Sequence, residues 1–233
     1  MIGAQASPVG SAVPIPATMP DVIDSERSLG ILDRLERRYP EVRIALEYRD
    51  PWQLLVSTVL SAQTTDDNVN KVVPELFATF PTPEDLAAAD PEEVERIVFT
   101  TGFYRQKTRA IIGLSQVLVD RFGGAVPDDL DKLVELPGVG RKTASVVLAE
   151  AFGRPAIAVD THVKRLSNRL GFTTHKDPNK IEQDLKRLFP ESAWRGLSLR
   201  LIQFGRDVCT ARKPHCGECE LADLCPFPDK SFE

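Results

Sequence analysis

The sequence predicts an all-α protein, and three observations support that fold class. Apolar residues recur at helical spacing along most of the 233 residues. Proline and glycine residues fall between the apolar segments, where helices begin and end. The one strand-like run, residues 156–159, is too short to support a sheet.

The first half of the chain contains five predicted helices. Their ranges are 28–39, 51–60, 66–80, 82–89 and 91–98. One face of the first helix carries the apolar or aromatic residues Leu29, Leu32, Leu35 and Tyr39. Pro51 favours a helix start because its fixed φ suits the first turn. We expect Asp66 or Asp67 to cap the third helix.

The second half contains six further predicted helices. Their ranges are 105–122, 128–136, 141–152, 161–170, 178–189 and 192–207. Gly123 and Gly124 are expected to end the first of these, because glycine readily adopts the left-handed conformation found after helices.

The N-terminal segment and the overall composition indicate a cytoplasmic protein. No Lys or Arg precedes Arg27 and no continuous apolar core follows, so a signal peptide is not predicted. No run approaches the roughly 18 apolar residues of a membrane span. Residues 1–20, which contain four prolines among small residues, are expected to form a disordered tail.

Positive charge is concentrated in one part of the chain. The formal net charge is −5, yet residues 160–215 hold 12 Lys and Arg against 6 Asp and Glu. Such a segment could form a face that binds phosphates. The alternative is ordinary solvated helix surface, and the charge pattern alone leaves both open.

All four cysteines lie close together near the C-terminus, in the pattern C-x6-C-x2-C-x5-C. They are Cys209, Cys216, Cys219 and Cys225. Disulfides are disfavoured because a chain without an export signal resides in a reducing compartment. Structural zinc and an iron–sulfur cluster both remain open, and the uneven spacing slightly favours the cluster.

Cations occupy the loop between the first two cysteines. Arg212, Lys213 and His215 lie there. A loop held at both ends by metal thiolates would fix these cations at low entropic cost, which favours contact with phosphates over ordinary surface charge.

Residues 133–144 read Leu-Val-Glu-Leu-Pro-Gly-Val-Gly-Arg-Lys-Thr-Ala and predict a helix–turn–helix hairpin. Pro137 ends the first helix, and Gly138 and Gly140 permit a tight reversal. The second helix begins near Gly140, where unobstructed N–H groups could bind a phosphate. A plain turn is the alternative, although it seldom needs Pro-Gly-x-Gly.

Lys142 and Asp160 are candidate reactive residues. Lys142 lies in the first turn of the second hairpin helix, where the helix dipole and partial burial would favour the neutral amine that a nucleophile requires. Asp160 precedes Thr161 and could stabilise developing positive charge. Helix capping alone would also explain Asp160.

Four segments in this order closely resemble the endonuclease III family of DNA glycosylases. They are Leu-Ser-Ala-Gln-Thr-Thr-Asp at 60–66, the hairpin at 136–144, Ala-Val-Asp-Thr-His at 158–162, and the cysteine pattern. The resemblance implies two helical domains with a DNA-binding cleft between them. These are a six-helix domain at 44–154, with its hairpin at 133–150, and an iron–sulfur cluster domain formed by 21–43 and 155–228.

The resemblance also implies site residues. Lys142 matches the catalytic lysine of the family and Asp160 its catalytic aspartate. Gln63 matches a glutamine that holds the opened base stack, and Phe103 stands where relatives have an aliphatic side chain. The remaining expected DNA-binding residues are Leu136, Gly138, Val139, Gly140, Arg141, His162, Arg212 and Lys213.

A combined activity follows from this resemblance. Lys142 implies a bifunctional DNA glycosylase and abasic-site lyase that removes oxidised pyrimidines through a lysine Schiff base and cleaves the strand by β-elimination. The cysteines would hold a 4Fe–4S cluster, and the hairpin carbonyls a monovalent cation. The implied partner is double-stranded DNA with a damaged base or an abasic site. The protein is expected to be a monomer that acts at the bacterial nucleoid and has no membrane partner.

Two rival functions would require other residues. The adenine-mismatch glycosylase branch has a glutamate in the second predicted helix and lacks the lysine, whereas this chain has Thr58 and Lys142 at those positions. A non-catalytic DNA-binding module with a zinc site is the other rival. It would not need Lys142 and Asp160 together.

Overall fold

The computed structural model describes residues 25–232, so the expected tail at 1–20 lies outside the described residues. The described part is helical and contains no β-strand, which confirms the all-α class. Its α-helices are α1 (Ser25–Arg38), α2 (Pro51–Leu60), α3 (Asp66–Thr79), α4 (Pro83–Ala87), α5 (Pro91–Val98), α6 (Tyr104–Phe122), α7 (Leu130–Val134), α8 (Arg141–Phe152), α9 (Thr161–Arg169), α10 (Pro178–Leu188) and α11 (Trp194–Asp207). No helix in this range is long and apolar enough to cross a membrane.

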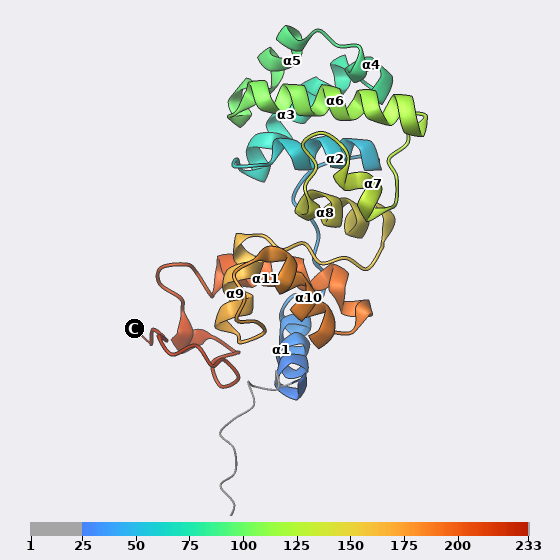
Figure 1. Cartoon of the computed structure of the whole chain (residues 1–233). Coiled ribbons are helices and arrows are strands. Elements are labelled where there is room, and N and C mark those ends of the chain that lie inside the picture. Colours follow the sequence, from blue (N-terminus) through green and yellow to red (C-terminus); the bar gives the residue numbers. More distant parts are fainter. Residues whose placement is uncertain (1–24, 233) are drawn as a thin grey trace, which may run out of the picture.

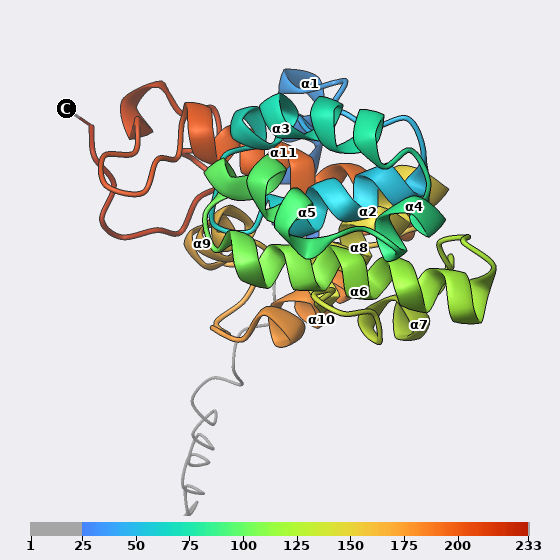
Figure 2. The same ribbon diagram turned by 90° about the horizontal axis from the view of Figure 1, so that it is seen from above.

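The buried apolar side chains form two separate cores. One core is built from residues of α2 to α8 and extends to Ala156. The other combines α1 with α9, α10 and α11 and reaches the cysteine segment. Figure 1 shows the corresponding two bodies, with α1 beside the C-terminal helices although it comes first in the sequence. Figure 2 shows α6 lying across one side of the first body.

The buried face of α1 differs from the predicted one. Leu29 is 45% exposed, whereas Ile31 is fully buried together with Leu35. Ile31, Leu32 and Leu35 form an i, i+1, i+4 stripe along the helix, and Leu29 falls at its solvent edge. The prediction for Leu29 was therefore wrong.

Polar residues fix the starts of the helices that carry the site. Thr65 caps α3 by accepting a hydrogen bond from the Asn68 N–H at 3.2 Å. Asp66 and Asp67, the expected caps, occupy the first turn instead, where carboxylates stabilise the helix dipole. Gly123 follows the last residue of α6 with φ +60° and ends that helix as predicted.

Candidate active site between the two cores

The hairpin between α7 and α8 is built around Gly138. This residue has φ +75°, and a Cβ added there would lie 2.6 Å from the Ala110 Cβ of α6. Gly140 starts α8 without any side-chain cap, and nothing lies within 4 Å of its missing Cβ. Leu136 and Val139 are buried in the first core. The turn is therefore anchored by apolar side chains, while its exposed glycine backbone faces outward.

Arg141 forms an ion pair with a carboxylate of the second body. Its guanidinium donates two hydrogen bonds, of 2.6 and 3.0 Å, to the Glu182 carboxylate of α10. Burial alone would raise the pKa of Glu182, but the bonds from Arg141 and Lys186 lower it below its usual range. The Arg141 side chain thus links the two bodies.

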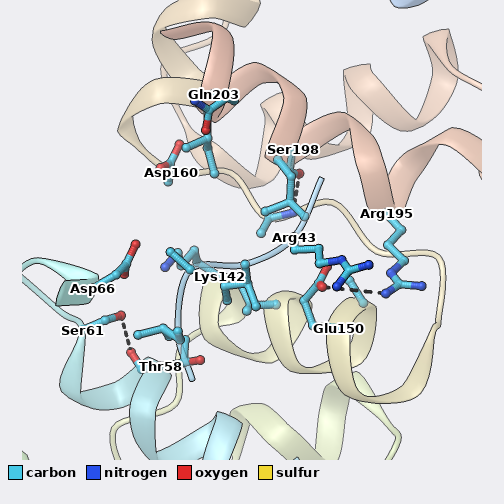
Figure 3. Close-up of a pocket in the computed structure, with 18 of the residues that line it drawn as sticks. Arg43, Thr58, Ser61, Asp66, Lys142, Glu150, Asp160, Arg195, Ser198 and Gln203 are labelled. Carbon is cyan, nitrogen blue, oxygen red and sulfur yellow. Dashed lines mark hydrogen bonds and ion pairs between the residues drawn. The ribbon is translucent and has the colours of Figure 1, made fainter. Parts of the chain in front are cut away.

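Lys142 and Asp160 line one pocket between the two cores. The pocket has a volume of about 200 Å³. Figure 3 shows Lys142 on the α8 side of this space and Asp160 on the opposite side. Lys142 is exposed rather than partly buried, so bound substrate would have to exclude water from its amine. The lysine and the carboxylate, which are distant in sequence, share one cavity.

Asp160 caps α9 and also lines the pocket. Its Oδ1 accepts a hydrogen bond of 2.8 Å from the Val163 N–H. Capping leaves the other oxygen free, and this Oδ2 lies 3.6 Å from the His162 Nδ1. Burial lowers the pKa of His162, and Asp160 opposes that shift in part. The sequence left capping and charge stabilisation as alternatives for Asp160, but the geometry permits both.

Gln63 and Phe103 are exposed side chains on two loops that are tied together. The Asn68 side-chain amide donates to Thr64 Oγ1 at 3.0 Å and to the Thr100 carbonyl at 2.9 Å. Thr64 is next to Gln63, and Thr100 lies three residues before Phe103. Phe103 is 63% exposed, so it is not a core aromatic. The half-buried Tyr104 beside it packs on the first core instead.

Lys107 holds the Phe103 loop through a hydrogen bond to its backbone. Its side chain is buried, and its amine donates a 2.7 Å hydrogen bond to the Thr101 carbonyl. Burial lowers the pKa of Lys107. Two hydrogen bonds, from Asn68 and from Lys107, therefore fix adjacent carbonyls of this loop.

The four cysteines line a second pocket at the C-terminal end. They are Cys209, Cys216, Cys219 and Cys225, and none forms a disulfide. Burial, together with the neighbouring thiols, raises the pKa of Cys219 and Cys225. Four clustered thiolates would repel one another without a cationic centre. The donor set therefore fits a metal group.

The spacing of the thiols favours a cluster over a single ion. Within residues 25–232, no three His, Cys, Asp or Glu side chains lie close enough to bind one metal ion. A multi-iron cluster places each thiolate on a separate iron, so its ligands stand further apart than those of tetrahedral zinc. Arg169 donates a 3.3 Å hydrogen bond to the Cys209 sulfur, as expected beside an anionic ligand.

The cysteine loop presents its cations outward. Arg212 and Lys213 are exposed in the segment between Cys209 and Cys216. The Thr210 hydroxyl donates to the Lys213 carbonyl at 2.5 Å, which closes this loop on itself. The fold therefore presents both side chains to solvent on a closed loop.

Several residues of the pocket were not predicted from the sequence. The lining also includes Arg43, Thr58, Ser61, Asp66, Glu150 and Arg195. The Asp66 Oδ2 lies 3.6 Å from the Arg206 Nη2 of α11, and this ion pair joins the two bodies. For Glu150 the sequence did hold one signal of a shared site with Lys142, because it follows that lysine by about two turns of α8.

Comparisons with known proteins assign both parts of the chain. Residues 56–191 match the HhH-GPD superfamily of base excision DNA repair proteins. Residues 209–225 match the iron–sulfur binding domain of endonuclease III. These two matches lie on the segments that hold Lys142, Asp160 and the four cysteines.

Curated relatives extend the similarity over most of the chain. Endonuclease III of Synechocystis sp. is 51% identical over 88% of this chain and 94% of its own length. Endonuclease III of Escherichia coli K12 is 39% identical over 89% of this chain and 99% of its own. A solved structure of a trapped endonuclease III–DNA covalent intermediate has a TM-score of 0.84 and 44% identity, covering 88% of this chain and 97% of that one.

Proposed function

This chain belongs to the endonuclease III family of base-excision DNA glycosylases, and we propose that Lys142 and Asp160 are its catalytic pair. It is a DNA glycosylase and abasic-site lyase of base excision repair with a 4Fe–4S cluster. The observation that supports the pair is the shared pocket, which receives the lysine from one body and the carboxylate from the other.

The proposed chemistry assigns each step to an atom. The neutral Lys142 amine attacks C1′, and the bond from C1′ to the base breaks, with its electron pair leaving on the base. The Asp160 carboxylate stabilises the positive charge that develops on the sugar. The C1′–O4′ bond then breaks with its electron pair going to O4′, which takes up a proton released by the attacking amine, and the ring-opened product is a protonated Schiff base. Removal of a C2′ proton then expels the 3′ phosphate by β-elimination.

The substrate is proposed to be duplex DNA with an oxidised pyrimidine or an abasic site. Gln63 and Phe103 would hold the opened stack while the base enters the pocket, at a cost of a few kcal/mol that damage lowers. The backbone N–H groups of Gly138, Gly140 and Arg141 would bind a phosphate. The side chains of Leu136 and Val139 are buried, so this turn offers DNA its backbone rather than those side chains.

The second body supplies the other proposed contacts. Arg212 and Lys213 would bind phosphates, and His162 would orient the Asp160 carboxylate. The cluster, when bound, cross-links the C-terminal segment. We also propose that the protein is a monomer that acts on the nucleoid in the cytoplasm. Its proposed domains are residues 44–154 and residues 21–43 plus 155–228. The carbonyls of the hairpin would bind a monovalent cation.

Borohydride trapping tests the catalytic assignment. The wild type should form a covalent adduct with a duplex containing one thymine glycol, because borohydride reduces the Schiff base to a stable amine. Lys142→Ala should form none, while retaining DNA binding. Lys132→Ala is the matched control, since Lys132 is an exposed lysine of α7 outside the pocket. An adduct formed by Lys142→Ala would refute the role of this lysine.

A further inference from the structure

Glu150 is a buried carboxylate that the catalytic steps do not use. Its side chain is 7% exposed, and its contact is an ion pair with Arg195, whose Nη2 lies 3.8 Å away. That distance is longer than a normal N–H···O hydrogen bond, so the pairing with Arg195 is loose. Burial raises the pKa of Glu150, and Arg195 opposes the shift only in part. This carboxylate therefore keeps hydrogen-bonding capacity for water or for a ligand in the pocket.

The carboxylate faces the same pocket as the nucleophile. Lys142, Val146 and Glu150 follow one another at four-residue spacing on α8 and all line the cavity. Figure 3 shows Glu150 and Arg195 facing each other at the end of the pocket away from Asp66. Lys142 and Glu150 are separated by eight residues, or about 12 Å along the helix axis. A substrate that contacts both residues would therefore extend along about two turns of α8.

We propose that Glu150 is a specificity-determining residue that accepts a hydrogen bond from the ring N–H of the extruded pyrimidine, while Arg195 donates to an adjacent ring carbonyl. This inference rests on the proposed function. The ligand class is a pyrimidine lesion that retains an imide edge, in which an N–H lies between two carbonyl oxygens. The carboxylate and the guanidinium present the complementary acceptor and donor.

The comparison with Arg141 and Glu182 argues against a purely structural pair. That pair also joins α8 to the second body, but its buried carboxylate receives two hydrogen bonds from Arg141 and an ion pair from Lys186 at 2.6 Å. The ion pair of Glu150 is longer, at 3.8 Å, and it is made with an arginine whose side chain is 55% exposed. The Glu182 site is complete without a ligand, whereas the Glu150 site has unused hydrogen-bonding capacity that points into the pocket.

Two lesions that differ by one methyl group test the proposal. Single-turnover excision of 5,6-dihydrouracil is compared with excision of its N3-methyl analogue, each rate divided by the same variant's rate on an abasic duplex. The wild type should disfavour the methylated base by about 10-fold or more, because the methyl group removes the N–H. Glu150→Gln, which keeps an acceptor oxygen, should retain most of this preference. Glu150→Leu should lose it.

Each outcome of this comparison decides the proposal. Glu75→Leu, which removes an exposed carboxylate paired with Arg96 far from the pocket, is the control and should keep the wild-type preference. A preference unchanged in Glu150→Leu would overturn the assignment, as would a wild type without any preference. Failure of the wild type to cleave the abasic duplex would instead contradict the proposed function, so the two failures are distinguishable.

Discussion

Gln63 and Phe103 are the two non-glycine residues with positive φ within residues 25–232, at +56° and +48°. A side chain in this region costs energy, so it persists only where the surrounding structure enforces it. Both residues are exposed, so burial of their own side chains does not offset the cost. The hydrogen bonds from Asn68 and Lys107 enforce the conformation of the Phe103 loop. Strain at two exposed side chains supports their proposed insertion into DNA.

Replacing Phe103 should affect base extrusion more than chemistry. Phe103→Ala should lower single-turnover excision of a paired lesion by about 10-fold, because the opened stack loses its wedge. The effect should be smaller for a lesion placed opposite an abasic gap, where less stacking is broken. Phe99→Ala is the matched control, since Phe99 is an aromatic residue 59% exposed near the same loop. Equal losses on both duplexes would argue against a wedge.

Residue identity alone predicted only part of this site. Lys142 and Asp160 became a pair through the resemblance, because the residues themselves left helix capping as a sufficient role for Asp160. The positive φ of Gln63 could not be predicted, since glutamine has no preference for that conformation. The positive φ of Gln63 results from the turn between α2 and α3 rather than from the glutamine side chain.

At the scale of elements, helices were predictable because their determinants are local. Apolar spacing, prolines and glycines lie within each segment, so α2, α5 and α8 have the expected bounds. The buried stripe of α1 was less predictable, because it depends on which side faces α10 and α11. Likewise, residues 156–159 are apolar because they pass between the two cores rather than because they form a strand.

The hairpin allows two glycines to be compared directly. Gly138→Ala should unfold at a markedly lower temperature, because the residue has φ +75° and its Cβ would clash with Ala110. Gly140→Ala should fold normally, because its φ is −90° and the space is open. It should nevertheless bind abasic duplex more weakly, since the methyl group would obstruct a phosphate approaching α8. Thermal unfolding and binding titrations check both expectations, and unchanged DNA affinity in Gly140→Ala would contradict phosphate binding at this turn.

At the scale of the whole molecule, the contacts between the two bodies could not be predicted. The pairs Arg141–Glu182, Glu150–Arg195 and Asp66–Arg206 join residues far apart in sequence. Each depends on how α3 and α8 lie against α10 and α11, which no local pattern specifies. The pocket that holds Lys142 and Asp160 has the same origin, because its lining comes from both bodies. Its general location followed from the resemblance, while its specific polar residues required the structure.

The Arg141–Glu182 pair makes a prediction about stability and pH. The pKa of Glu182 is lowered in the folded state, so its contribution to stability is present above the unfolded pKa of about 4.3 and is lost as pH falls through the folded value. Glu182→Gln should lower the free energy of unfolding at pH 7 by about 1–3 kcal/mol, because the bonds to Arg141 and Lys186 lose their charge.

Urea unfolding of wild type and Glu182→Gln at several pH values measures this contribution. Taking the difference between the two proteins removes effects that acid has on both, including any on the cluster. The difference should be constant near neutral pH and should shrink as pH falls below the unfolded pKa of about 4.3, because the carboxylate is protonated first in the unfolded chain and only at lower pH in the folded protein. A difference that grows as pH falls would mean that Glu182 is destabilised by its surroundings. The linkage between the two bodies would then have to rest on the other two ion pairs.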